Sequence, residues 1–115
     1  MKNFSTRQLK VGQEIKSILS NFFMRGDVYD PNTFKAINIT ISEVQVTPDL
    51  NYADVYFIPL GGVESKNTSE ILQSIASKLK WQIGKQMNIR TIPNLVFKID
   101  KSFDVAQRIE ELTKS

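Results

Sequence analysis

Two hydrophobic periods follow one another along this chain, and their order predicts its fold class. Apolar residues recur at helical spacing between Val11 and Phe22. Ser5 and Gln8 precede this stripe with the spacing of a capping box, in which each side chain accepts a hydrogen bond from the other residue's backbone N–H, and Gly26 follows it. We therefore expect a helix that begins after Ser5 and ends before Gly26.

The period then changes to two residues, which is the spacing of a β-strand with one apolar face. The apolar positions Ile37, Ile39 and Ile41 alternate with polar residues. Val44 and Val46 fall on even positions, so the alternation slips by one residue. A bulge near Ser42 and Glu43 would keep all of these apolar side chains on one face of the strand.

A turn from Thr47 to Asn51 and a second strand from Tyr52 to Ile58, rich in β-forming residues, predict an antiparallel hairpin. After the loop Pro59–Asn67, the pair Asn67 and Glu70 gives a second capping signal. A helix from Thr68 to Met87 is expected to follow. It contains weak helix formers, at which a kink is permitted: Ser74, Ser77 and Gly84.

Beyond Pro93, a third strand is predicted from the alternation of Leu95, Phe97 and Ile99, and a short helix from Phe103 to Leu112. A long helix between the second and third strands requires a right-handed crossover that places these strands parallel. The predicted class is α+β, with a small mixed three-stranded sheet and helices on one face. At 115 residues, the chain 1–115 is expected to form a single domain.

Charge is sorted along the sequence. No Asp or Glu occurs between Glu70 and Asp100, and this segment carries five cations: Lys78, Lys80, Lys85, Arg90 and Lys98. Residues 1–26 carry five cations, Arg7 and Lys10 among them, against only Glu14, which adds +4. The rest of the chain must carry −6 to give the net charge of +3. Cations gathered on two segments favour a polyanionic partner, and nucleic acid is the leading candidate.

The second helix also indicates which side chains meet that partner. At about 100° per residue, Leu79 and Ile83 share one face, and Trp81 lies nearly opposite. Lys78 and Lys85 are its surface neighbours, so Trp81 is placed either to stack on an unpaired base or to cover a neighbouring element. The candidate RNA-binding residues are Lys78, Lys80, Trp81, Lys85 and Arg90, with Arg7 and Lys10 on the first helix.

Composition argues against most catalytic chemistry. The chain has no cysteine and no histidine, so disulfides, thiolate ligands and the commonest general base are excluded. The pairs Asp49–Asp54 and Asp100–Asp104 come without a base or a metal shell, and Gly61–Gly62 does not have the spacing of a phosphate loop. A small enzyme acting on acyl phosphates is therefore disfavoured. We expect a cytosolic, monomeric protein without cofactor or metal.

Four stretches of this sequence resemble the ribosome-binding factor A family. They are Thr47–Phe57, Arg90–Asp104, Arg7–Val11 and Arg108–Leu112, and their order and spacing match over nearly the whole chain. The resemblance implies a type-II KH fold with the order α-β-β-α(kinked)-β-α. It implies a bacterial cytoplasmic assembly factor that binds the free 30S small subunit and its rRNA, assists late maturation and 16S rRNA processing, and supports growth in the cold.

We expect no membrane or DNA partner. A ribosome-associated GTPase is left open as a second partner beside the small subunit. This sequence departs from the family pattern at the kink between the helices, where Ile75-Ala76-Ser77 stands in place of Ala-x-Gly. Close approach of a backbone to phosphate favours residues without a Cβ atom. Recognition of folded rRNA by shape and charge is therefore expected, rather than a single-strand clamp.

Two hypotheses follow for the mode of action. In the first, the protein is a non-catalytic binder that stabilises one rRNA arrangement through its basic helical face. In the second, it is a protein-interaction module on the small subunit that blocks subunit joining without direct contact with rRNA.

Overall fold

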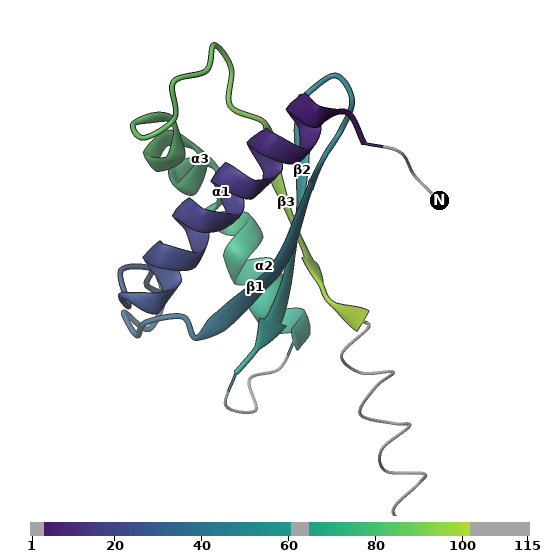
Figure 1. Cartoon of the computed structure of the whole chain (residues 1–115). Helices are drawn as coiled ribbons and strands as arrows, with labels where there is room; N and C mark the ends of the chain where they lie inside the picture. Colours follow the sequence, from purple (N-terminus) through teal and green to yellow (C-terminus); the bar gives the residue numbers. More distant parts are fainter. Residues whose placement is uncertain (1–3, 61–64, 102–115) are drawn as a thin grey trace, which may run out of the picture.

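The computed structural model describes residues 4–60 and 65–101. Its elements are α1 (Thr6–Met24), β1 (Ile39–Val46), β2 (Tyr52–Pro59), α2 (Ser65–Ser74), α3 (Ala76–Gly84) and β3 (Asn94–Ile99) (Figure 1). This order confirms the α+β class expected from the sequence. The predicted helix Phe103–Leu112 lies outside the described residues.

The three strands form a mixed sheet in the order β1-β2-β3. β1 and β2 are antiparallel, and β2 and β3 are parallel, as the length of the crossover predicts. The register shifts between Ile41 and Glu43, which confirms the predicted bulge. Beyond the bulge, Val44 lies opposite the buried Val55, so the slip in alternation leaves the apolar residues on the face that the helices cover.

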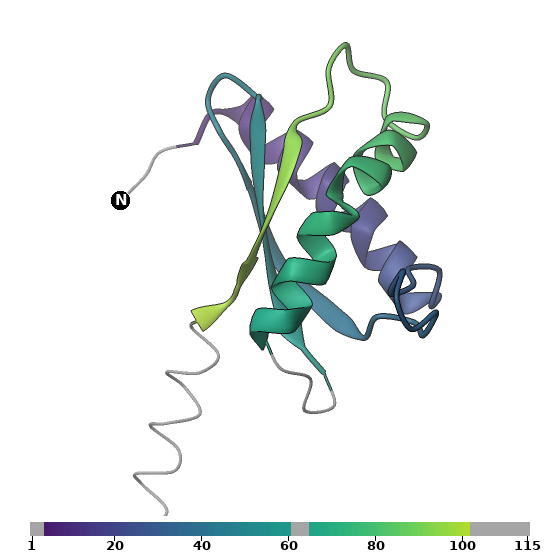
Figure 2. The same cartoon turned by 180° about the vertical axis from the view of Figure 1, so that it is seen from behind.

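Of the described residues, α1, α2 and α3 lie on the same side of the sheet, as Figures 1 and 2 show from opposite directions. The core between the two layers is filled by buried apolar side chains from every element. The largest fully buried ones include Ile15 and Leu19 from α1, Phe57 from β2 and Ile83 from α3. Burial of such side chains contributes about 1.5–3 kcal/mol each, so this interface holds the layers together.

α1 begins as predicted. The Gln8 backbone N–H donates to Ser5 Oγ (3.1 Å), and the Ser5 N–H donates to Gln8 Oε1 (2.8 Å). The same Gln8 side chain is buried, and its Nε2 donates to the Val46 carbonyl at the end of β1 (2.9 Å). One amide therefore both caps the helix and joins it to the edge of the sheet.

Further along α1, Gly12 brings the helix close to β1. A Cβ atom at this position would lie 2.9 Å from the Val44 carbonyl oxygen, which is closer than real Cβ atoms come to such neighbours. The absence of a side chain therefore sets the distance between helix and strand.

The segment predicted as one helix from Thr68 to Met87 is two helices. α2 starts at Ser65, so Asn67 lies within it and is not its N-cap, and α3 ends at Gly84, before Met87. The interruption falls at Ile75, whose φ and ψ are −105° and 6°. Just before it, Ser74 Oγ donates to the Ile71 carbonyl (2.6 Å), which is the local competition by which serine bends helices.

A side chain from α2 bonds two backbone groups on the outer edge of β3. Gln73 Nε2 donates to the Leu95 carbonyl (3.2 Å), and the Phe97 N–H donates to Gln73 Oε1 (3.1 Å). The side-chain amide thus satisfies two backbone groups of an edge strand, which would otherwise be available to another strand.

We expect Gly12→Ala to lower the free energy of unfolding by about 1–3 kcal/mol, because α1 must move away from β1 to accommodate the new methyl group. Chemical denaturation measures the difference. Gly84→Ala is the matched control, since its Cβ would meet only Ile92 Cγ1 at 3.5 Å, an ordinary contact. A Gly12→Ala protein as stable as the wild type would contradict the close approach.

The turn between β1 and β2 predicts a pH effect. The Thr47 hydroxyl (2.7 Å) and then the Asn51 backbone N–H (3.0 Å) donate to the Asp49 carboxylate, and they lower the pKa of Asp49 below its ordinary 3.8. A lowered folded pKa stabilises the turn above pH 3.8, and the effect is lost as the pH falls through the folded value. A carboxyl ¹³C NMR titration should show a midpoint below 3.8 for Asp49, shifted upward in Thr47→Val. A midpoint at or above 3.8 in the wild type would refute these contacts.

Candidate nucleic-acid interface

The orientation of α3 follows from its apolar spacing. Leu79 and Ile83 are buried against the sheet, and Trp81 is 63% exposed on the opposite side. This confirms that the indole points outward. Because Trp81 is the only tryptophan in the chain, it is also a spectroscopic reporter of this surface.

Trp81 lines a shallow hollow between α3 and the segment that leads into β3. We call it the cationic hollow; its volume is about 600 Å³, and it is lined by Ser77, Lys80, Trp81, Gly84, Lys85, Arg90, Thr91 and Ile92. Lys85 Nζ lies 3.7 Å from the centroid of the Trp81 ring, a cation–π contact. Lys80 Nζ donates to Asn94 Oδ1 (2.9 Å) and so connects α3 to the start of β3.

Every charged residue that lines the cationic hollow is a cation. Lys80, Lys85 and Arg90 contribute three positive charges, and no acidic residue of the described chain lines the hollow. A concave surface of one sign concentrates counter-ions, and an exposed indole offers a face on which a base can stack. The arrangement therefore has the chemistry of a site for single-stranded or folded nucleic acid.

The other predicted residues lie apart from this hollow. Lys78 lines a different hollow, on the side of α3 that faces residues 27–34, although it is three residues before Trp81. Arg7 and Lys10 are exposed near the start of α1 and line neither hollow. Lys98 forms an ion pair with Asp54 across β2 and β3 (3.2 Å).

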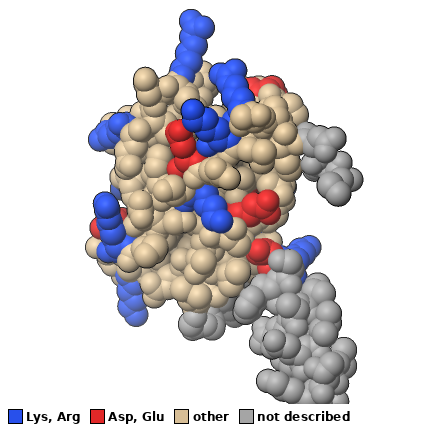
Figure 3. Space-filling model, in the orientation of Figure 1, with Lys and Arg blue, Asp and Glu red and all other residues tan. Residues whose placement is uncertain are grey.

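The predicted kink residues are also divided between the two hollows. Ser77 lines the cationic hollow, Ile75 lines the hollow beside residues 27–34, and Ala76 is buried between them. Figure 3 shows Lys and Arg side chains spread over the face that carries α1, with acidic side chains among them. That face is of mixed sign, whereas the charged residues that line the cationic hollow are all cations.

Tyr29, Phe34 and Gln73 are not among the residues that the sequence predicts to be functional. For the two aromatics a signal exists: they stand in a segment of turn-forming residues, Gly26 to Asn32 and beyond, where no apolar periodicity requires them. For Gln73 there is none, because its role depends on the register of β3 against α2.

The order αββααβ and the mixed sheet with helices on one face define a small domain of the type-II KH class. The sequence profile described as Ribosome-binding factor A matches residues 7–113, and the chain belongs to this family. This confirms the family expected from the sequence.

Curated relatives support the assignment. The chain is 40% identical over 100 residues to the ribosome-binding factor A of Ruegeria sp., a match that covers 87% of this chain and 76% of that protein. It is 35% identical over 114 residues to that of Rhodopseudomonas palustris, which covers 96% and 80% respectively.

Solved structures show the same fold. The crystal structure of ribosome-binding factor A from Thermus thermophilus superposes with a TM-score of 0.67 at 18% identity, covering 80% of this chain and 93% of that one. A homology model of the Thermus thermophilus protein, fitted into the cryo-EM map of a 30S–RbfA complex, superposes with a TM-score of 0.55 at 18% identity, covering 76% and 93%.

The charge around Trp81 can be measured by fluorescence quenching. Measured against the free indole of N-acetyltryptophanamide, the ratio of iodide to caesium quenching should be about seven-fold higher for Trp81, because a positive potential of about one kT enriches the anion and depletes the cation. Lys85→Glu should reduce this ratio. Lys16→Glu, an equal charge change at an exposed site on α1, should leave it unchanged. An iodide-to-caesium ratio no higher than that of N-acetyltryptophanamide in the wild type would contradict a positive hollow.

Proposed function

We propose that the protein binds the free 30S small ribosomal subunit and assists its late maturation and the processing of 16S rRNA. The observation that carries this proposal is the family match over residues 7–113. It is supported by the Thermus thermophilus relative, which was placed in a map of a 30S–RbfA complex. We further propose that the protein acts in the cytoplasm and supports growth in the cold.

We propose the cationic hollow as the surface that contacts rRNA. Lys80, Lys85 and Arg90 supply charge for phosphates, and Trp81 supplies a ring for an unpaired base. The break between α2 and α3 has side chains at Ile75, Ala76 and Ser77, whose Cβ atoms hinder the close backbone approach that a glycine clamp allows. This favours recognition of folded rRNA by shape and charge over a grip on one strand.

The proposed role is that of a binder rather than an enzyme. Stabilising one arrangement of the rRNA requires only that the protein bind that arrangement more tightly than its alternatives. Within residues 4–60 and 65–101, no group of three or more acidic side chains is arranged to hold a metal ion, and no helix there is long and apolar enough to cross a membrane.

Co-sedimentation with purified small subunits and with joined ribosomes tests the proposal. The wild type should bind free small subunits in a salt-sensitive manner and should not bind joined ribosomes. The double variant Lys85→Glu, Arg90→Glu should bind at least about ten-fold more weakly, and the dependence of log affinity on log salt should become shallower by about one to two.

The control is the double variant Lys16→Glu, Lys35→Glu, which makes the same change in net charge at exposed positions outside the cationic hollow. Its binding should stay within about three-fold of the wild type. Retained binding by the Lys85, Arg90 variant would favour the alternative, a protein-interaction module that blocks subunit joining without direct rRNA contact. Binding of the wild type to neither particle would refute the proposal.

A further inference from the structure

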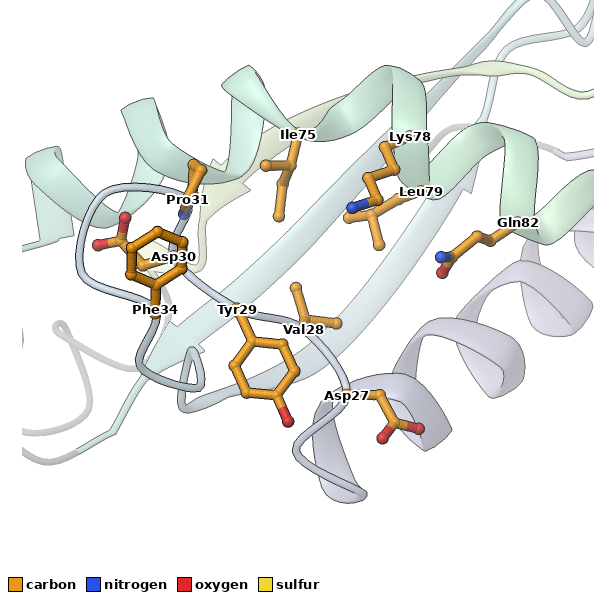
Figure 4. Close-up of a pocket in the computed structure, with 10 residues that line it drawn as sticks. All are labelled: Asp27, Val28, Tyr29, Asp30, Pro31, Phe34, Ile75, Lys78, Leu79 and Gln82. Atoms are coloured by element: carbon orange, nitrogen blue, oxygen red, sulfur yellow. The ribbon is translucent and has the colours of Figure 1, made fainter.

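A second hollow lies on the other side of α3, between this helix and the segment that connects α1 to β1. We call it the loop hollow; its volume is about 370 Å³. Figure 4 shows Ile75, Lys78 and Leu79 directed from the helices toward the loop, with Val28 rising from the loop to meet them. Val28 and Leu79 are buried and give the hollow an apolar floor.

Two exposed aromatic rings stand at its margin. Tyr29 is 56% exposed and Phe34 is 80% exposed, and both line the hollow. Isolated exposed apolar residues are ordinary, but two rings beside an apolar floor form a patch of the kind that contacts a partner.

The backbone holds Phe34 in an unfavourable conformation. Its φ is +60°, a region that bulky side chains rarely adopt. Hydrogen bonds fix it there: the Phe34 N–H donates to the Asp30 carbonyl (2.8 Å), and the Asp30 N–H donates to the Lys35 carbonyl (2.8 Å). The Phe34 ring is mostly exposed, so it contributes little to the core. Backbone strain of this kind is concentrated at binding sites.

The loop is anchored on both sides of these rings. The Ile37 N–H donates to the Val28 carbonyl (2.8 Å), and Tyr29 forms an isolated antiparallel bridge with Ala36. At the end of α1, Gly26 adopts a φ of +70° and the Asp27 N–H donates to the Phe22 carbonyl (3.0 Å), the hydrogen bond of a Schellman cap. The walls of the hollow are therefore preorganised, which reduces the entropy cost of binding.

Charge distinguishes the loop hollow from the cationic hollow. Asp27, Asp30 and Lys78 line it, so its net charge is −1, whereas the lining of the cationic hollow carries +3. Two carboxylates beside an apolar floor disfavour phosphate groups and favour a partner with cationic side chains. An apolar concavity of a few hundred Å³ fits one bulky side chain.

We propose that the loop hollow docks a basic segment of a protein of the small subunit. One bulky apolar side chain of that segment inserts between Tyr29, Phe34 and the apolar floor, while flanking Lys or Arg side chains face Asp27 and Asp30. The inference rests on the proposed function for the location of its partner. α3 then separates two binding surfaces, one for rRNA and one for protein.

Photo-cross-linking tests the proposal on the full chain. Phe34→p-benzoylphenylalanine keeps an aromatic ring at an exposed position, and the same replacement at Trp81 reports on the cationic hollow. Each protein is bound to purified small subunits and irradiated, and the products are identified by nuclease digestion, protease digestion and mass spectrometry. Position 34 should cross-link to a protein segment that contains several Lys or Arg residues and a bulky apolar residue, and position 81 to rRNA.

A charge variant and controls accompany this experiment. Asp27→Lys should lower the protein cross-link from position 34 by about three-fold or more. It is chosen because Asp27 is exposed, whereas the Asp30 carboxylate accepts the Asn32 N–H and supports the loop. Glu14→Lys makes the same charge change on α1 and should leave the yield unchanged. Leu9→p-benzoylphenylalanine, at another exposed apolar position, gives the background.

Each outcome is decisive. Cross-links from position 34 to rRNA, to a second copy of this chain, or only at the background yield would overturn the inference alone, provided that the unmodified protein co-sediments with small subunits. If it does not co-sediment, the proposed function and this inference fall together. A protein cross-link that survives Asp27→Lys undiminished would overturn the charge complementarity on which the choice of partner depends.

Discussion

The arrangement of this domain depends on how closely α1 approaches β1. At Gly12 the helix backbone faces the Val44 carbonyl without a side chain between them, and one turn earlier the Gln8 amide bonds the Val46 carbonyl. These contacts fix the direction of α1 across the sheet. That direction determines where α1 ends, and hence where Val28 lies relative to Leu79. The floor of the loop hollow therefore depends on a glycine in the N-terminal half of the helix.

The break at Ile75 determines how α2 and α3 lie along β3. A continuous helix would have one straight apolar stripe, whereas two shorter helices each follow the twisted sheet along β3. α2 places Gln73 beside β3, α3 turns Trp81 outward, and Lys85 is exposed at the C-cap of α3. At this break Ser77 lines the cationic hollow and Ile75 lines the loop hollow, so residues two apart in the sequence contribute to hollows of opposite net charge.

Much of the fold was predictable from the sequence because it depends on local pattern. The Ser5–Gln8 cap, the bulge after Ile41 and the parallel pairing of β2 and β3 follow from spacing and chain length alone. The outward direction of Trp81 follows from helix geometry. The start of α2 before Asn67 was not predictable, because capping residues also occur inside helices when packing extends them.

Which residues form the candidate sites was harder to predict from the sequence. Lys78 and Lys85 are both close to Trp81 on an ideal helix, and only the position of the α1–β1 segment directs Lys78 to a separate hollow. Phe34 has a positive φ, held by the bond from its N–H to the Asp30 carbonyl and by the bond from the Asp30 N–H to the Lys35 carbonyl, and no periodicity encodes this conformation. Such features depend on tertiary structure rather than on sequence pattern.

The side chain of Gln73 ends in the same amide group as the main chain, and on β3 it occupies the place of a missing neighbouring strand. During synthesis, Gln73 is made before residues 94–99, so the side chain that covers β3 is already present when that strand joins the sheet. For nascent copies of the chain crowded on one messenger RNA, two backbone groups fewer on this edge are open to pairing between copies, at the moment when their local concentration is highest.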